Sequence, residues 1–200
     1  MKELLIDYTP FIVSQQEINE SILENSGKLI VKGTLQRANS KNQNGRVYPK
    51  PILEREIKKY YENCVKIRRA LGELDHPNSQ VVNLSNTSHN VLSMDWNGDD
   101  VIGTIEILDT PAGNILKSLF KAGITLGISS RGLGSVKRLT MEEDVVEVQP
   151  DFELIAFDFV SNPSTYGAFL YPMNESYNSE SNNSKYFKIN SIITDIILQF

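Results

Sequence analysis

The 200-residue sequence has one cysteine, two histidines and no long apolar run. The lone cysteine, Cys64, excludes an internal disulfide and fits a reducing compartment. No segment approaches the roughly 20 apolar residues that span a bilayer, and the N-terminus lacks the apolar region of a signal peptide. A formal net charge of −5 is atypical of proteins that bind a phosphate backbone. We therefore expect a protein whose partners are neither membranes nor nucleic acids.

Metal and nucleotide sites are also disfavoured. The two histidines, His76 and His89, with one cysteine and scattered acids, lack the spacing of metal ligands. Neither glycine-rich phosphate-binding pattern is present: the G-x-G at Gly132 and Gly134 has no helix behind it. We expect no metal and no cofactor. The 40% hydrophobic and 22% charged residues are typical of a soluble domain.

Turn, cap and periodicity signals divide the chain into an N-terminal extension, a strand-rich domain and a tail. Residues 78–90 read as a polar loop that contains His89. Residues 174–185, rich in Asn, Ser and Glu, should be disordered, and the apolar residues 186–200 form either a docking tail or a packed terminal helix. The patterns predict helices near 14–24, 51–64 and 111–122, and strands near 28–35, 69–74, 91–96, 101–108, 126–136, 145–148 and 152–161.

The stretch 126–136 is unusual for a strand because it is rich in glycine and serine. Glycine within a strand indicates that another backbone or a ligand comes close. Alternation places Gly127, Ser129 and Arg131 on one small, polar face, and Ser130 with apolar neighbours on the other. This face is a candidate platform for a nucleophile. Ser129 is favoured over Ser130 because it lies on the polar face.

A serine nucleophile needs a base and a group that orients the base. His76 is the favoured base because it ends a strand and precedes Pro77, which stiffens the backbone, whereas His89 lies in the polar loop. For the orienting group, Asp158 stands in an otherwise apolar strand, where a carboxylate is costly unless it is paired. Asp158 either accepts from His76 or forms a salt bridge, for instance with Arg131.

The rival carboxylates Glu73 and Asp75 are expected to face away from His76 because they are so close to it in sequence. Arg131 has two open roles: it binds the oxyanion, directly or through water, or it holds Asp158.

Three separated motifs resemble the prohead core protease of T-even-type tailed bacteriophages, a family that shares the fold of herpesvirus assemblin. They are Gly45–Lys50 (GRVYPK), Ala70–Pro77 (ALGELDHP) and Gly127–Ser135 (GISSRGLGS). The resemblance runs from about residue 28 to 172. It implies an α+β fold with an antiparallel, barrel-like sheet surrounded by helices, and a serine protease domain over 28–172.

The resemblance also implies a function and roles for individual residues. The family enzymes are serine endopeptidases that digest the internal scaffold and trim capsid proteins inside the assembling prohead, in the host cytoplasm, and are activated by self-cleavage. His76 and Ser129 match the family's histidine and nucleophile, and Asp158 occupies the strand that carries the third member. Arg131, Ser130 and Gly132 are candidates for oxyanion binding or support. Scaffold and capsid proteins are the expected partners, and the enzyme is expected to form a homo-oligomer.

The segments outside the protease domain are candidates for processing. Family enzymes favour cleavage after glutamate with Leu or Ile two residues before it, which Glu20 and Glu24 satisfy within the extension 1–27. This extension is therefore a candidate propeptide, and residues 173–200 are a candidate docking or propeptide segment.

Two other classes of function remain open. The chain could be a non-enzymatic capsid-assembly or scaffold protein that keeps the protease fold. It could also be a β-rich binding module in which Ser129 and Arg131 hold an anionic ligand.

Overall fold

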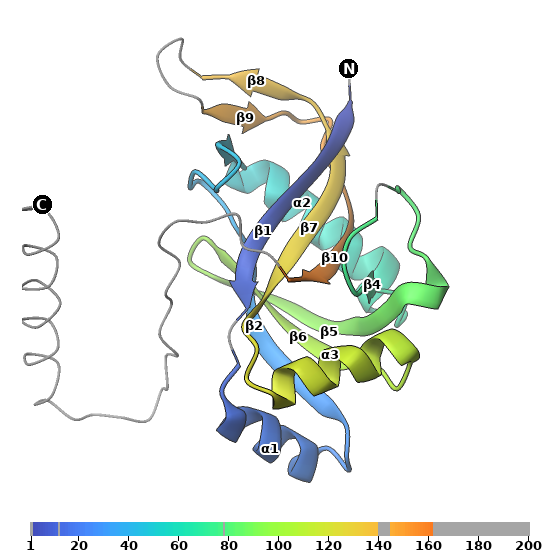
Figure 1. Cartoon of the computed structure of the whole chain (residues 1–200). Helices are drawn as coiled ribbons and strands as arrows, with labels where there is room; N and C mark the ends of the chain where they lie inside the picture. The colour runs from blue at the N-terminus through green and yellow to red at the C-terminus, as the bar shows by residue number, and fades with distance from the viewer. Residues whose placement is uncertain (1, 12, 78, 140–144, 162–200) are drawn as a thin grey trace, which may run out of the picture. The chain divides into compact units, whose positions relative to one another are not determined.

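The computed structural model describes residues 2–11, 13–77, 79–139 and 145–161, which form a mixed α/β, strand-rich arrangement (Figure 1). Three α-helices lie in this part of the chain: α1 (Gln15–Glu24), α2 (Lys50–Tyr60) and α3 (Pro111–Lys121). A π-helical turn, η1 (Tyr61–Val65), continues α2, and a 3₁₀ turn, η2 (Leu84–Asn86), precedes β5. The strands of the described residues are β1 (Glu3–Phe11), β2 (Leu29–Arg37), β3 (Arg46–Val47), β4 (Leu71–Glu73), β5 (Thr87–Asn97), β6 (Asp100–Ile107), β7 (Leu126–Gly134), β8 (Val136–Arg138), β9 (Val146–Val148) and β10 (Glu153–Val160).

The strand with the two serines, β7, is the centre of a three-stranded sheet in the order β1-β7-β10. Both neighbours run antiparallel to it. β1 pairs with β7 without interruption, from Glu3 opposite Gly134 to Phe11 opposite Leu126. In β10 the register shifts between Leu154 and Ala156, which leaves the pairing around Ser129 regular. The serine stretch therefore has a strand on each side.

A four-stranded antiparallel sheet follows the order β2-β6-β5-β4, and the small sheet β3-β9-β8 contains one parallel pairing, β3 with β9. Two places link the larger sheets. Leu74, just after β4, forms a parallel bridge with Phe159 of β10, and β1 contacts β2. The first link places the end of β4 beside the end of β10.

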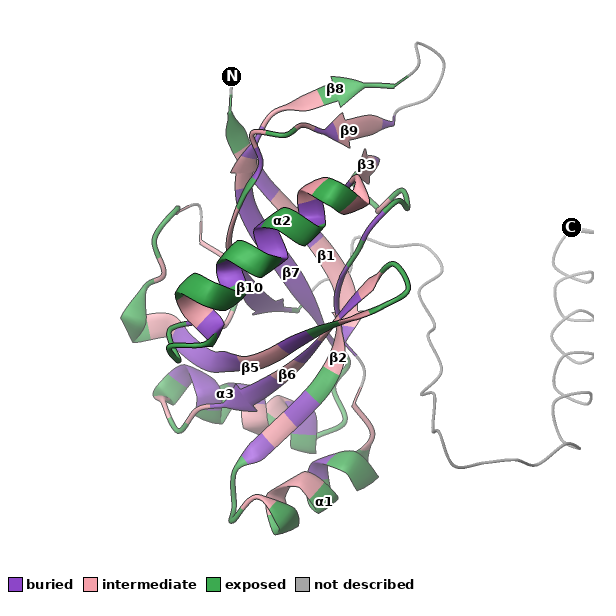
Figure 2. Ribbon diagram, turned by 180° about the vertical axis from the view of Figure 1, so that it is seen from behind, coloured by how far each residue is buried: buried purple, intermediate pink, exposed green. Residues whose placement is uncertain are grey.

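Local sequence signals explain the helices. Thr110 caps α3, since its hydroxyl accepts from the amide of Gly113 at 3.0 Å, and Pro111 occupies the first turn. The apolar stripe of α3 buries Leu116 and Phe120, and α2 buries one face and exposes the other (Figure 2). The helices predicted near 14–24, 51–64 and 111–122 are confirmed. Rings from several elements meet edge-on around Phe159, namely those of Phe11, His89 and Phe120.

The N-terminal segment differs from the expected peripheral extension. Its first part is β1, and Leu5, Phe11 and Ile18 are buried in the core. The sequence pattern hides this strand because Asp7 occupies a buried position and Pro10 interrupts the run. Proline is tolerated there because β1 is an edge strand of its sheet.

The predicted loop over 78–90 is also too long. β5 already begins at Thr87, so that His89 belongs to a strand. A run of polar residues, Thr87 to Asn90, conceals the strand although all four are buried.

Several predictions concern segments outside the described residues. They include residues 162–172 of the predicted protease domain, the polar stretch 174–185 and the apolar tail 186–200. Within the described residues, no helix combines the length and hydropathy that crossing a membrane requires.

Candidate active site

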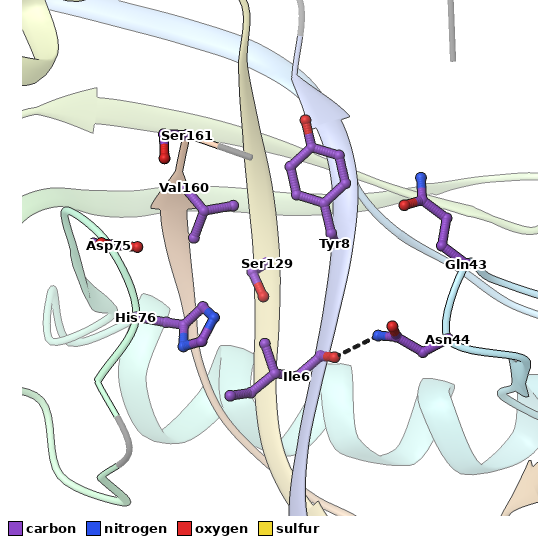
Figure 3. Close-up of a pocket in the computed structure, with 9 residues that line it drawn as sticks. All are labelled: Ile6, Tyr8, Gln43, Asn44, Asp75, His76, Ser129, Val160 and Ser161. Carbon is purple, nitrogen blue, oxygen red and sulfur yellow. Dashed lines mark hydrogen bonds between the residues drawn. The ribbon is translucent and has the colours of Figure 1, made fainter. Parts of the chain in front are cut away.

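A pocket of about 340 Å³ opens on the face of the β1-β7-β10 sheet that carries Ser129 (Figure 3). Its walls come from β1, the loop before β3, the segment after β4, the middle of β7 and the end of β10. The lining residues are Ile6, Tyr8, Gln43, Asn44, Asp75, His76, Ser129, Val160 and Ser161. Ser129 and His76 thus line one pocket, and Figure 3 draws both side chains among those that surround it.

Ser129 lies between Tyr8 on one neighbouring strand and Asp158 on the other. Its hydroxyl oxygen is buried and has no hydrogen-bond partner within the described residues. Ser130 faces the opposite side of the sheet, where its hydroxyl is 3.5 Å from the carbonyl oxygen of Asp7. Of the two serines, therefore, Ser129 alone lines the pocket.

His76 is held in the pocket by the backbone of its own segment. The amide of Asp75 donates to the carbonyl of Phe159 at 2.7 Å, which joins this segment to the end of β10. Asp75 has a left-handed backbone with φ of +63°, which breaks the strand alternation between Glu73 and His76. As a result Asp75 and His76 both line the pocket, contrary to the expectation that Asp75 faces away.

A buried ionic cluster lies behind the histidine segment, and it consists of Arg131, Asp158 and Glu73. All three side chains are at most 1% exposed. The Nη2 of Arg131 donates to Glu73 Oε1 at 3.1 Å and to Asp158 Oδ1 at 3.2 Å. The Nε of Arg131 is 2.9 Å from Asp158 Oδ2. The salt bridge between Asp158 and Arg131, one of the two alternatives above, is therefore present.

The cluster also fixes the loop that carries His76. Asp158 Oδ1 accepts from the amide of Glu73 at 3.0 Å, and Glu73 Oε1 accepts from the amide of Asn83 at 3.0 Å. The Nη1 of Arg131 donates to the carbonyl of Ser79 at 2.8 Å. The loop is thus tied to the sheet at its beginning, middle and end.

Asp158 is hydrogen-bonded to Arg131 and to the amide of Glu73. Within the described residues no hydrogen bond joins Asp158 to His76, and Nδ1 of His76 is buried without a partner. Burial raises the pKa of Asp158 to about 6, although the Glu73 amide and Arg131 favour the ionised form. The carboxyl group therefore acts on the histidine segment through the backbone of Glu73.

The other residues predicted to support the oxyanion, Arg131, Ser130 and Gly132, do not line the pocket. Two nitrogens of Arg131 donate to Ser79, Glu73 and Asp158, and the third lies against Asp158. Gly132 lies against the ring of Phe152 and the carbonyl of Glu153. These contacts are those of residues that support the sheet and the loop.

A further buried carboxylate, that of Asp7, was not identified in the sequence. It is 1% exposed and accepts from Arg46 Nη1 at 2.9 Å, from Asn44 Nδ2 at 2.8 Å, and from the hydroxyl of Tyr48. Burial raises the pKa of Tyr48 well above 10, so its hydroxyl stays protonated as a donor. The motif around Gly45–Lys50 thus holds β1 and brings Asn44 to the pocket.

His89 has a structural environment. It is fully buried, its Nε2 donates to the carbonyl of Phe157 at 3.0 Å, and its Nδ1 accepts from the hydroxyl of Ser88 at 2.8 Å. Burial lowers the pKa of His89 to about 4, which keeps the ring neutral. The prediction that His89 lies in a polar loop is therefore wrong, because the residue is buried in β5.

The two predicted self-cleavage residues, Glu20 and Glu24, are exposed on α1. The residue two before Glu20 is Ile18, which is fully buried, whereas Ile22 before Glu24 is partly exposed. Cleavage after Glu24 therefore requires less local unfolding of α1 than cleavage after Glu20.

A hydroxyl and an imidazole line one pocket, and a buried carboxylate fixes the segment that carries the imidazole, an arrangement that is typical of hydrolases. Comparison with known proteins gives the family. The family described as prohead core protein serine protease matches residues 3–181, and the chain belongs to it.

Individual relatives agree with this family. The chain is 35% identical over 161 residues to the prohead core protein protease of Enterobacteria phage T4, covering 78% of this chain and 75% of that protein. The structure of the bacteriophage T4 capsid assembly protease, gp21, matches with a TM-score of 0.68 and 29% identity. That match covers 80% of this chain and 98% of the other. The chain is therefore a phage prohead core protease involved in capsid assembly.

Proposed function

We propose that the chain is a serine endopeptidase in which Ser129 is the nucleophile and His76 the general base. The observation that carries this proposal is that both residues line one pocket, each with a buried polar atom that has no partner within the described residues. Unpartnered buried groups cost stability, so they are typical of sites kept for chemistry.

In the proposed reaction, His76 takes the proton of the Ser129 hydroxyl while the oxygen attacks the scissile carbonyl carbon. The imidazolium then protonates the leaving amine as the tetrahedral intermediate collapses to an acyl-enzyme. Water, deprotonated by His76, attacks the ester, and the carboxylic product leaves as the proton returns to Ser129.

Asp158 completes this machinery as a positioning residue. It accepts from the amide of Glu73, three residues before His76, and Arg131 ties the same loop at Ser79. The proposal is that the ionic cluster sets the position of the imidazole through the backbone. Arg131, Ser130 and Gly132 are accordingly assigned to support and not to oxyanion binding.

We also propose that the two larger sheets close into a barrel like that of herpesvirus assemblin. The strand order supports this, since β4 follows β10 through the Leu74–Phe159 bridge and β2 contacts β1. Such closure would place the helices outside the sheet.

The substrates we propose are scaffold and capsid proteins inside the assembling prohead, in the host cytoplasm, and the enzyme acts as a homo-oligomer. Self-activation would cut after Glu24 in preference to Glu20, because Ile18 is buried. The tail 173–200 is a second candidate for processing or docking.

The test is incubation of the wild type with the phage's scaffold protein, beside Ser129→Ala, His76→Gln and the matched control Ser130→Ala. Cleavage should fall at least about 10³-fold in the first two variants and persist in the control. Equal processing by Ser129→Ala would remove the nucleophile assignment. Absence of cleavage by every form, wild type included, would favour a non-enzymatic assembly protein.

A further inference from the structure

The N-terminal strand contributes an aromatic wall to the pocket. Tyr8 is directly opposite Ser129 in the register of β1 and β7, and both residues line the pocket. Its ring extends diagonally over Gly127, because a Cβ built at position 127 would overlap the ring carbons and hydroxyl of Tyr8. Gly127 is on the same face as Ser129, so the phenol lies along the row of residues that contains the nucleophile.

The position of Tyr8 is fixed from the opposite face of its strand. Asp7, the preceding residue, is held by Arg46, Asn44 and Tyr48. The pairing of β1 with β7 continues on both sides of Tyr8. The phenol therefore projects from a rigid strand.

The backbone of β7 has no free donor near Ser129. In a central antiparallel strand each residue bonds its N–H and C=O to one neighbouring strand or the other. Both neighbours of Ser129 are in regular register at this point. A peptide over the pocket must therefore be held by side chains and by flanking segments.

From these observations we infer that Tyr8 is a substrate-positioning residue: its ring supports a side chain of the bound peptide, and its hydroxyl donates to an oxygen of that peptide. This inference rests on the proposed function, because it takes the pocket around Ser129 as the peptide site. The hydroxyl makes no hydrogen bond within the described residues, in contrast to that of Tyr48. Burial raises the pKa of Tyr8, which keeps the phenol protonated as a donor.

The experiment measures binding without turnover. The full chain carrying Ser129→Ala is titrated into a fluorescent peptide with the sequence of residues 15–27 of this chain. Adding Tyr8→Phe should weaken binding by about 3–10-fold, the loss of one hydrogen bond, and Tyr8→Ala should weaken it further. Tyr61→Phe, on the surface of η1, is the matched control and should leave the affinity unchanged.

Gly127→Ala tests whether the packing of the Tyr8 ring against Gly127 matters for peptide binding. With Tyr8 present the added methyl displaces the phenol, so peptide affinity should fall about as far as in Tyr8→Ala. In the Tyr8→Ala background the same change should have little further effect on affinity, which is the signature of direct coupling. Thermal unfolding of each variant identifies a misfolded protein, and Tyr8→Phe remains informative if Gly127→Ala does not fold.

Two outcomes separate this inference from the proposed function. Unchanged affinity in Tyr8→Phe and Tyr8→Ala, or no peptide binding to the Ser129→Ala chain, would overturn the role of Tyr8. Labelling of Ser129 by a small fluorophosphonate needs no peptide site, so it should persist in the Tyr8 variants. Its absence from the wild type would instead count against Ser129 as the nucleophile.

Discussion

The strands on either side of β7 each carry a buried carboxylate, and the two carboxylates are paired by different sets of donors. Asp7 on β1 has one guanidinium, one amide and one phenol as donors. Asp158 on β10 shares Arg131 with a second carboxylate, Glu73. Each cluster attaches a loop to the central sheet, Asn44 with its neighbours in the first case and the His76 segment in the second.

The two clusters differ in the number of carboxylates that share one arginine and in the exposure of that arginine to solvent. Arg46 keeps 19% of its side chain exposed, whereas Arg131 and Asp158 are completely buried. Burial raises the pKa of Asp158, so the contribution of the second cluster to stability depends on pH. Because its charges are fully buried, this cluster also loses more stability when one partner is removed. We therefore expect changes at Asp158 to disturb the base, and changes at Asp7 to disturb the pocket wall.

The largest effect is expected from Arg131→Met, which breaks the second cluster. The variant leaves Glu73 and Asp158 buried without their cation, which should lower the free energy of unfolding by about 3–5 kcal/mol. Denaturant unfolding measures this change. Arg37→Met is the matched control: it removes the exposed ion pair with Asp100 and should cost at most about 1 kcal/mol. Similar costs for the two variants would mean that the buried cluster contributes no more than a surface pair.

A smaller effect, and one that depends on pH, is expected from Asp158→Asn. A carboxyl group whose pKa rises on folding binds its proton more tightly in the folded state, so its contribution to stability falls as pH rises from about 4 through 6. The stability advantage of wild type over the variant should therefore shrink by roughly 2–3 kcal/mol between pH 4 and 7.

Unfolding of both proteins at the two pH values checks this expectation. His89, with its lowered pKa, gains stability as pH rises over the same range. Its contribution is common to both proteins and cancels in their difference. A stability difference between wild type and variant that stays constant or grows with pH would contradict the raised pKa of Asp158.

The smallest effect is expected in the first cluster, from Tyr48→Phe. The loss of one buried hydrogen bond to Asp7 should cost about 1.5 kcal/mol, with Arg46 and Asn44 still in place. Because this cluster holds the pocket wall, KM should rise about two- to threefold with kcat nearly unchanged. Tyr60→Phe, a buried tyrosine of α2 whose hydroxyl forms no hydrogen bond within the described residues, is the control. A fall in kcat with constant KM would remove the distinction between the clusters.

Local signals in the sequence were sufficient to predict the bounds of α3 and the two faces of β7. The cap and stripe of α3 predict its bounds, because Thr110, Pro111 and Gly123 each act within one turn. Alternation along β7 separates Ser129 from Ser130, since a regular strand obeys the period of two.

The residues that escaped prediction depend on partners far away in the chain. Asp7 looks like a break in an apolar run until Arg46 and Tyr48 are brought to it by the fold. Tyr8 has no distinctive neighbours in sequence, and its relation to Gly127 exists only through strand register. Asp75 escapes the expected alternation because its own backbone is left-handed.

The continuous pairing of β1 with β7 determines what happens to the N-terminal segment after cleavage. If the polypeptide is cut in α1, the covalent link between β1 and β2 is lost, but nine paired residues and the side chain of Asp7 still hold the released piece. The mature enzyme would then be a noncovalent complex of two fragments. A gel under denaturing conditions would display two bands where gel filtration finds one particle.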